Sequence, residues 1–232
     1  MADPASPRVR SYHARRGRLS TRHHESLATI GRTWLVDASG DIIDLGGLFG
    51  RTIPVVLDIG CGMGESTLGQ ASDAPDVGVI AIDVHTRGVA TLMRRGDRVG
   101  LTNVRVVHGD AVTFIDERLA PASISGARIY FPDPWPKARH HKRRLIQPTF
   151  VSLLASRIVP GGFVHCATDD SIYAEQMLDV LGADPRLENP FDGFAPQSIP
   201  GAVGRPSTKY ERRSERLGHP VHDVWVTRRL PA

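Results

Sequence analysis

Between residues 53 and 169, five short apolar runs alternate with segments of helix length, and this alternation restricts the fold more than any other feature of the chain. The apolar runs occupy residues 53–60, 77–83, 103–110, 127–133 and 161–169. The intervening and following segments predict helices at about 64–73, 86–99, 111–118, 148–158 and 171–181. Strands separated by helices pair in parallel, so we expect an α/β fold with a doubly wound, mostly parallel sheet and helices on both faces.

The ends of these elements carry their own signals. Pro148 suits the first turn of a helix, and Ser171 is a candidate N-cap for the last one. Gly161 and Gly162 are expected to stop the helix that begins at Pro148. Residues 221–230 alternate as a final strand, expected to join the sheet antiparallel at one side. With 232 residues, we expect a single domain over 34–232, preceded by a flexible basic arm over 1–33.

Positive charge gathers in three segments of the chain. The formal net charge is +4, from 29 lysines and arginines against 25 acidic residues. Residues 1–33 and 137–144 each carry a net +5, and residues 205–229 carry +4. These segments hold 19 cations and 5 acids, which leaves 10 cations and 20 acids for the rest. An acidic body with three basic segments favours a nucleic-acid partner, although any one segment alone is equally consistent with a solvated surface.

Other features bear on location and metals. No apolar run reaches the roughly 18 residues that a membrane-spanning helix needs, so no membrane span is expected. The arginine-rich arm also has the composition of a mitochondrial transit peptide, which is the alternative to an arm that binds nucleic acid. Cys61 and Cys166, the only cysteines, suggest reduced thiols in a cytoplasmic protein. The histidine pairs at 23–24 and 140–141 lack acidic or cysteine partners nearby, so no metal is expected.

A glycine-rich turn follows the first apolar run in "VVLDIGCGMG". Asp58 ends the run and is followed by Gly60, Gly62 and Gly64, which allow the backbone to turn sharply and approach a ligand. A dinucleotide-binding motif would place its third glycine where Glu65 stands, and a carboxylate there would repel a pyrophosphate. S-adenosylmethionine has no phosphate, and Asp58 could accept from its ammonium group. A chance glycine-rich turn remains the alternative.

Two further acids end the next two apolar runs. Asp83 is placed to accept from both ribose hydroxyls of such a cofactor, and Asp110 from its adenine amino group. Each also precedes a predicted helix, so an N-cap is an equal alternative for either acid. Together with Asp58 they end three consecutive parallel strands. Ligands of doubly wound sheets bind in the crevice outside those ends.

The fourth apolar run leads into "YFPDPWPKARHHKRR", the most specific stretch of the chain. Pro132, Pro134 and Pro136 stiffen the backbone around Asp133 and Trp135. One interpretation of this stretch is structural: a proline-stiffened loop with a packed tryptophan. A loop that places an acid and an aromatic beside a methyl donor, as in methyltransferases acting on planar nitrogen bases, is the functional one.

These residues resemble the bacterial tRNA (guanine-N7)-methyltransferase family, whose hallmark stretch is similar to "FPDPWPKARHHKRR" here. The similarity continues through "RLIQPTF", "GGFVHCATDDSIYAEQML" and "PSTKYERRSERLGH", and covers roughly residues 50–229. The resemblance implies a Rossmann-like class I methyltransferase fold. It implies transfer of a methyl group from S-adenosylmethionine to N7 of guanine 46, in the variable loop of tRNA.

The resemblance also implies roles for individual residues. Asp133 is the expected catalytic residue. The expected cofactor-binding residues are Asp58, Asp83, Asp110 and Asp133, together with Gly60 of the glycine-rich turn. The expected substrate-binding residues are Lys137, Asp169, Thr208, Lys209, Tyr210 and Glu211. The expected RNA-contacting residues are Ala138, Arg139, His140, His141, Lys142 and Arg143.

The chain departs from the family pattern at four positions. Asp58 and Asp83 stand where Glu is more frequent, so their contacts to a cofactor would have different lengths. Asp170 stands where an aromatic residue often follows the "TD" pair, which changes one wall of the expected pocket. Tyr210 in place of Phe is a milder change.

The chemistry of guanine N7 fits these assignments. N7 carries a lone pair and no proton, so the enzyme mainly has to position its two substrates. Asp133 could stabilise the cation that develops on the ring, and Asp169 and Glu211 could accept from guanine N1 and N2. Trp135 could stack on a flipped base, although packing under the loop is an equal alternative. The competing functions are a noncatalytic RNA-binding protein with this fold and a methyltransferase for another substrate.

Overall fold

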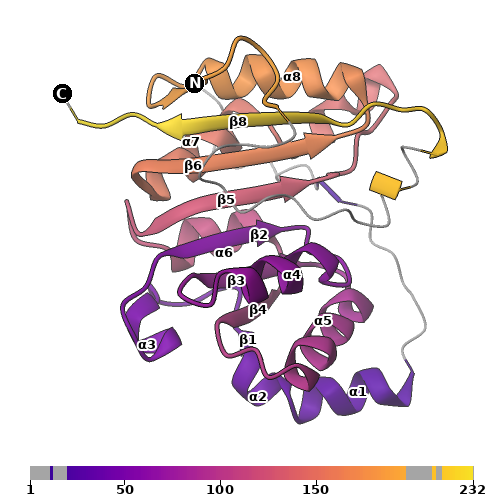
Figure 1. Ribbon diagram of the computed structural model, residues 1–232, viewed down its shortest axis with the longest axis vertical. Coiled ribbons are helices and arrows are strands. Elements are labelled where there is room, and N and C mark those ends of the chain that lie inside the picture. The colour runs from indigo at the N-terminus through magenta and orange to yellow at the C-terminus, as the bar shows by residue number, and fades with distance from the viewer. Residues whose placement is uncertain (1–10, 13–19, 197–210, 213–215, 232) are drawn as a thin grey trace.

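An eight-stranded sheet forms the centre of the structure, a computed structural model that describes residues 11–12, 20–196, 211–212 and 216–231 (Figure 1). The strand order is β1-β4-β3-β2-β5-β6-β8-β7. The strands are β1 (Leu35–Val36), β2 (Val55–Ile59), β3 (Gly78–Asp83), β4 (Val104–His108), β5 (Ile124–Tyr130), β6 (Ile158–Thr168), β7 (Leu187–Glu188) and β8 (His222–Arg228). All neighbours from β1 to β6 are parallel, while β8 is antiparallel to β6 and β7.

Helices cover both faces of this sheet. They are α1 (Thr21–Ala28), α2 (Gly31–Trp34), α3 (Leu45–Phe49), α4 (Glu65–Asp73), α5 (Thr86–Arg98), α6 (Ala111–Arg118), the 3-10 helix η1 (Ala138–Arg143), α7 (Pro148–Arg157) and α8 (Ser171–Gly182). In Figure 1, α4 and α5 lie in front of the sheet and α6 and α7 behind it. Alternate residues of β3 divide accordingly: Ile80 and Ile82 pack in the cluster with α6, α7 and α8, and Val79 and Ala81 in the cluster with α4 and α5. The expected doubly wound architecture is confirmed.

The five predicted strands and five predicted helices are all present, and the differences lie at their ends. The N-cap of α8 is Asp170, whose carboxylate accepts from the Tyr173 amide, so the assignment of Ser171 as the cap was wrong. α7 ends at Arg157, before the glycines expected to stop it, because Ile158 already adopts an extended conformation. Gly161 and Gly162 therefore lie within β6. β8 is antiparallel near one edge, as expected.

Part of the expected N-terminal arm is folded. Helices α1 and α2 occupy residues 21–34, and α1 contacts α5. Trp34 is only 5% exposed, and it packs where Gly96 of α5 has no side chain, since a Cβ there would lie 2.3 Å from its ring. The boundary at residue 33 was therefore wrong. The flexible arm stays a prediction for residues 1–10 and 13–19, which lie outside the described ranges.

A row of hydrogen-bonded polar side chains, all buried except the half-buried Tyr130, crosses the α4 face of the sheet. Arg128 donates to Gln70 at 2.8 Å, and Gln70 lies 3.4 Å from the hydroxyl of Tyr130. That hydroxyl is 2.9 Å from His165 Nδ1, and His165 Nε2 is 2.7 Å from the carboxylate of Asp223. Buried polar groups are tolerated only when they are hydrogen-bonded. These hydrogen bonds therefore fix the register of β5, β6 and β8 relative to α4.

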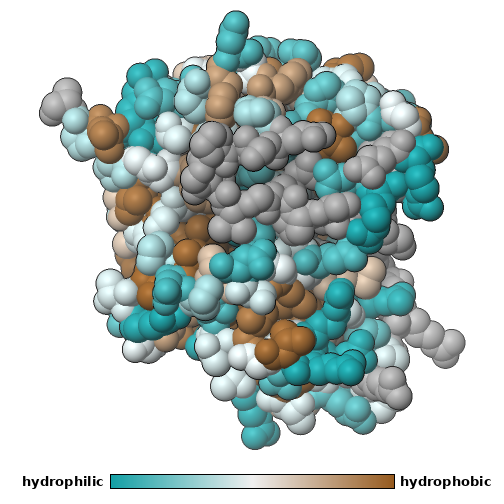
Figure 2. Space-filling model, viewed as in Figure 1, coloured by the Kyte–Doolittle hydropathy of each residue, from teal (hydrophilic) through white to brown (hydrophobic). Residues whose placement is uncertain are grey.

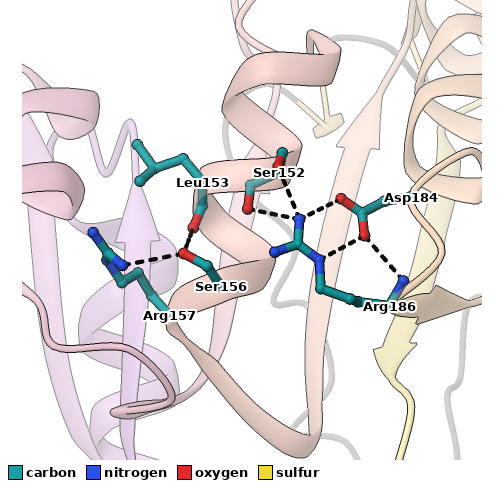
Figure 3. A network of polar contacts seen from close by, with 6 residues as sticks. All are labelled: Ser152, Leu153, Ser156, Arg157, Asp184 and Arg186. Atoms are coloured by element: carbon teal, nitrogen blue, oxygen red, sulfur yellow. Dashed lines mark hydrogen bonds and ion pairs between the residues drawn. The ribbon is translucent and has the colours of Figure 1, made fainter.

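On the opposite face, a smaller network ties α7 to the turn after α8 (Figure 3). The guanidinium of Arg186 contacts the Asp184 carboxylate at 2.7 Å and donates to the Ser152 carbonyl and hydroxyl at 2.9 Å each. The hydrogen bond from Arg186 holds the pKa of Asp184 below its ordinary value. A depressed carboxyl pKa stabilises the fold above the ordinary pKa, and this contribution is lost as the pH falls through the folded-state pKa.

We expect Asp184→Asn to lower the free energy of unfolding at pH 7 by about 1 kcal/mol, the upper end for ion pairs that remain partly exposed. The difference from the wild type should disappear in acid, as Asp184 of the wild type becomes protonated. Urea denaturation at a series of pH values measures both quantities. Asp116→Asn is the matched control, because Asp116 is 68% exposed and lies 3.8 Å from its partner Arg157. Equal losses in the two variants would contradict the prediction.

Candidate active site

The glycine-rich turn joins β2 to α4 at the carboxyl end of the sheet, where β3 lies on one side of β2 and β5 on the other. Gly60, Gly62 and Gly64 have φ angles of 83°, 54° and 76°, in the left-handed region that favours glycine. A Cβ at Gly64 would lie 2.5 Å from Leu92 of α5. At Gly60 and Gly62, by contrast, a Cβ would meet no atom within 4 Å. The turn therefore presents bare backbone to open space, which fits a ligand that approaches the main chain closely.

Asp58 lies beneath this turn and is buried, with 3% exposure. Its carboxylate accepts from the hydroxyl of Thr67 on α4 at 2.5 Å. Burial raises the pKa of Asp58 above its ordinary value, while Thr67 and the neighbouring Arg128 act in the opposite direction. Arg128 is the register partner of Asp58 on β5. A cationic ligand group at the turn would offset the desolvation of this carboxylate.

Asp83 ends β3 and holds the glycine-rich turn in place. One carboxylate oxygen accepts from the Gly62 amide at 2.8 Å and the other from the His85 amide at 2.7 Å. The N-cap of α5 is His85, so the N-cap alternative for Asp83 was wrong. Because a carboxylate oxygen can accept more than one hydrogen bond, these contacts leave room for a ligand hydroxyl.

Asp110 follows β4 and caps α6. Its Oδ1 atom accepts from the amides of Val112 and Thr113 at 2.9 Å and 3.1 Å. The N-cap alternative is thus confirmed for this acid. Its position at the carboxyl end of the sheet keeps it beside Asp83, since β3 and β4 are neighbours and Asp83 pairs with His108.

The proline-stiffened loop after β5 contains two residues with left-handed backbone, Phe131 at φ 51° and Trp135 at φ 46°. Such conformations cost on the order of 1 kcal/mol for residues other than glycine and persist where the surroundings enforce them. The Phe131 amide donates to the Ala167 carbonyl at 2.7 Å, and Arg144 donates to the Pro134 carbonyl at 2.8 Å. Asp133 lies half-buried in the middle of this constrained loop.

Trp135 packs beneath the loop. It is 5% exposed, its Nε1 donates to the Ser11 carbonyl at 3.1 Å, and it contacts the ring of His140 edge-on. The guanidinium of Arg143 lies 4.9 Å from its ring centroid. These contacts favour the packing alternative over stacking on a flipped base.

The basic segment of residues 137–144 divides into exposed and buried parts. Lys137, Ala138, Arg139 and Lys142 are exposed at or within η1. Arg144 is only 3% exposed, and it donates to Gln176 at 2.6 Å as well as to the loop. The segment therefore offers fewer cations to a partner than its composition implies, because Arg144 is a structural residue.

The expected substrate-binding residues are described only in part. Asp169 follows β6 at the carboxyl end of the sheet and is half-buried. Arg212, next to Glu211, pairs with Glu65 at the start of α4 at 3.3 Å. This contact brings Glu211 to the same end of the sheet as the glycine-rich turn. Thr208, Lys209 and Tyr210 lie outside the described residues.

The two cysteines of the chain are Cys61 and Cys166. Both thiols are unpaired, and burial raises the pKa of Cys61 and of Cys166 above the ordinary value. Among the described residues, no group of three or more His, Cys, Asp or Glu side chains is arranged to hold a metal ion. No helix in the described part of the chain is long and apolar enough to cross a membrane.

Known proteins resemble this chain along most of its length. A family model described as a putative methyltransferase matches residues 52–224. The tRNA (guanine-N(7)-)-methyltransferase of Streptomyces avermitilis is 50% identical over 236 residues, covering 99% of this chain and 80% of the relative. The enzyme of the same name from Paraburkholderia xenovorans is 47% identical over 222 residues, covering 96% and 84%.

Solved structures with lower identity share the fold. The 16S rRNA methyltransferase KamB matches with a TM-score of 0.57 at 15% identity, covering 82% of this chain and 96% of that chain. The 16S rRNA (adenine(1408)-N(1))-methyltransferase of Catenulisporales acidiphilia matches with a TM-score of 0.53 at 16% identity, covering 84% and 96%. The fold is therefore the Rossmann-like fold of class I methyltransferases.

Proposed function

This chain belongs to the tRNA (guanine-N7-)-methyltransferase family, and we propose that it transfers a methyl group from S-adenosylmethionine to N7 of a guanine in tRNA, forming 7-methylguanosine. The observation that carries the proposal is the 50% identity to a relative of this name along 99% of the chain. We assign the target to guanine 46 of the variable loop. The proposed place of action is the cytoplasm, where tRNA is modified.

The carboxyl end of the sheet fits the cofactor. S-adenosylmethionine supplies an electrophilic methyl group on a sulfonium centre. Gly60 and Gly62 leave the backbone bare, and Asp58 provides a buried carboxylate for the ammonium group. We assign Asp83 to the ribose hydroxyls and Asp110 to the adenine edge, since each ends a strand beside the turn. Asp133 completes the set from the far side of the crevice.

The guanine is assigned to residues beside the cofactor-binding turn. Asp133 positions the base and stabilises the positive charge that develops on its ring, because it lies in a loop held from both ends. Asp169 and Glu211 accept from the N1 and N2 donors of guanine, a pattern that adenine lacks. Lys137 and the segment Thr208–Tyr210 are assigned to the same substrate on family similarity.

The RNA backbone is assigned to Ala138, Arg139, His140, His141, Lys142 and Arg143, which form η1. η1 follows the loop that carries Asp133, so phosphates gripped there flank the target base. Arginine and lysine side chains neutralise phosphates and release counterions, which gives salt-dependent affinity without base specificity.

The test is nucleoside mass spectrometry of unmodified tRNA incubated with the protein and methyl-labelled S-adenosylmethionine. We expect labelled 7-methylguanosine in tRNA, and none when guanine 46 is replaced by adenine. A noncatalytic RNA-binding protein would bind tRNA without forming the product. A methyltransferase for another substrate would bind the cofactor in a calorimeter and leave tRNA unlabelled. Either result would overturn the proposal.

A further inference from the structure

The acidic body of the chain, outside the three basic segments, contains ten arginines and no lysine. Six of them contact another described group through their guanidinium: Arg51, Arg105, Arg118, Arg128, Arg157 and Arg186. The remaining four are Arg87, Arg94, Arg95 and Arg98. Their guanidinium groups make no hydrogen bond or ion pair with any described residue, and all four lie on α5.

Three of these arginines form one line along α5. At 100° per residue, Arg87, Arg94 and Arg98 lie within about 40° of one another, directly opposite the buried side of the helix. That buried side contains Gly88, Val89, Leu92, Met93 and Gly96. Arg95 lies on one flank of the line and Asp97 on the other. We call Arg87, Arg94 and Arg98 the arginine stripe; all three are exposed.

The stripe differs from an ordinary solvated helix face. Such faces usually mix charges so that opposite signs meet at i and i+4, whereas Arg94 and Arg98 place like charges at that spacing. The helix dipole favours cations near the C-terminus, which accounts for Arg98 but not for Arg87 in the first turn. A polyanion that contacts the whole stripe explains all three positions.

α5 lies against the proposed active site. A Cβ on Gly88 would be only 2.5 Å from the Gly62 carbonyl, so the first turn of α5 packs directly on the glycine-rich turn. The strand order places α5, which packs on β3 and β4, on the side of β2 opposite to β5 and η1. The crevice therefore has α5 on one side and η1 on the other.

The space-filling view shows hydrophilic side chains beside a smaller hydrophobic patch in this part of the molecule. Teal side chains gather at the lower right of Figure 2, over the region where α1 and α5 lie in Figure 1. α1 follows the basic N-terminal segment in the sequence and contacts α5. A helix of 13 residues is about 20 Å long, which spans several phosphates of an RNA strand.

We propose that the arginine stripe, with Arg95 on its flank, is a second docking surface for the sugar-phosphate backbone of tRNA. This inference rests on the proposed function and extends it. The tRNA contacts η1 on one side of the crevice and α5 on the other, with the target guanine between them. The stripe contributes affinity and orientation without contacting the reacting atoms.

The test compares the wild type with a variant carrying Arg87→Gln, Arg94→Gln and Arg98→Gln. Glutamine has a helix propensity close to that of arginine, so α5 should remain folded. We expect the Kd for unmodified tRNA to rise at least tenfold near 0.1 M salt, and the slope of log K against log salt to flatten by about 0.7 to 0.9 per lost phosphate contact. The Kd for S-adenosylmethionine, measured by calorimetry, should stay unchanged.

Three further variants complete the experiment. Lysine at the same three positions should keep the salt slope, because the charge remains. Neutralising Arg139, Lys142 and Arg143 of η1 should give a loss comparable to that of the stripe variant. Arg51→Gln with Arg229→Gln removes two exposed arginines at the opposite end of the sheet, where both pair with acids, and should leave tRNA binding unchanged.

The outcomes separate this inference from the proposed function. If the glutamine variant binds tRNA with the affinity and salt slope of the wild type, the stripe is only a solvated face and the inference fails. If the wild type binds tRNA but forms no 7-methylguanosine, the proposed function fails whatever the arginine variants do. A glutamine variant that loses affinity for S-adenosylmethionine as well as tRNA also overturns the inference, since the stripe would then support the glycine-rich turn.

Discussion

Asp83→Ala is expected to weaken binding of S-adenosylmethionine at least a hundredfold. The Asp83 carboxylate accepts from the amides of Gly62 and His85, and in its proposed role it also accepts from the ribose. A hydrogen bond to a charged group contributes about 1.5 to 3 kcal/mol, and about 1.4 kcal/mol changes an equilibrium constant tenfold. Loss of the two hydrogen bonds to the ribose hydroxyls therefore raises the Kd for S-adenosylmethionine by a factor between about a hundred and ten thousand. Isothermal titration calorimetry measures it directly.

A conservative variant separates the contact with the cofactor from the support of the turn. Asp83→Glu retains the carboxylate and restores the residue more frequent in the family, so we expect cofactor affinity within about tenfold of the wild type. Thermal unfolding without cofactor reports the turn alone. An alanine variant that binds S-adenosylmethionine with wild-type affinity would remove Asp83 from the site. If the alanine variant lost affinity for S-adenosylmethionine only in proportion to its loss of thermal stability, Asp83 would be a structural residue of the turn.

The fold could be predicted because the core repeats a simple pattern. Residues 78–82, for example, are buried on both faces of the sheet and are apolar throughout, and a helix must follow before the chain can return in parallel. The two-residue strands β1 and β7 carry no such pattern and were missed. Helix α1 was missed for a related reason. It is eight residues long and buries little besides Ser26, so its apolar period is too short to detect.

The positions of the site acids could be predicted from the ends of the strands, but their local contacts could not. Asp110 caps α6, whereas the sequence left an N-cap and a ligand contact as equal alternatives for this acid. Arg144 looks like one more cation of a basic run, yet it is buried under the loop that carries Asp133. Burial depends on packing between α8 and the loop, which are distant in sequence. Composition cannot reveal it.

Two features absent from the sequence predictions had detectable signals. Arg128 interrupts an otherwise apolar strand, and a charge in such a position requires a buried partner, which Gln70 supplies. The arginines of α5 recur at intervals of seven and four residues, the period of one helix face. Acidic residues surround them in the sequence, so they do not form a basic segment along the chain. Only the helix brings them together on one face.

Asp133→Asn is expected to lower the rate of methyl transfer in a single turnover by about a hundredfold to a thousandfold. Asparagine keeps the shape of the side chain but removes the charge that opposes the developing ring cation. Removing one preorganised group of this kind costs about 2.7 to 4 kcal/mol in transition-state stabilisation. Saturating tRNA and cofactor remove binding from the measured rate, so the change reports the chemical step alone.

The rate should also lack the rise with pH that a general base produces, since guanine N7 has no proton to remove. Asp169→Asn is the matched control, because Asp169 is assigned to base recognition. This substitution should raise the Kd for tRNA by a larger factor than it lowers the rate at saturating tRNA. The constrained loop makes the result interpretable: Phe131 and Arg144 hold it through backbone carbonyls that the substitution leaves intact. If the Asn variant methylated tRNA at the wild-type rate, Asp133 would be a structural residue of this loop. The stabilisation of the ring cation would then have to come from another group in the crevice.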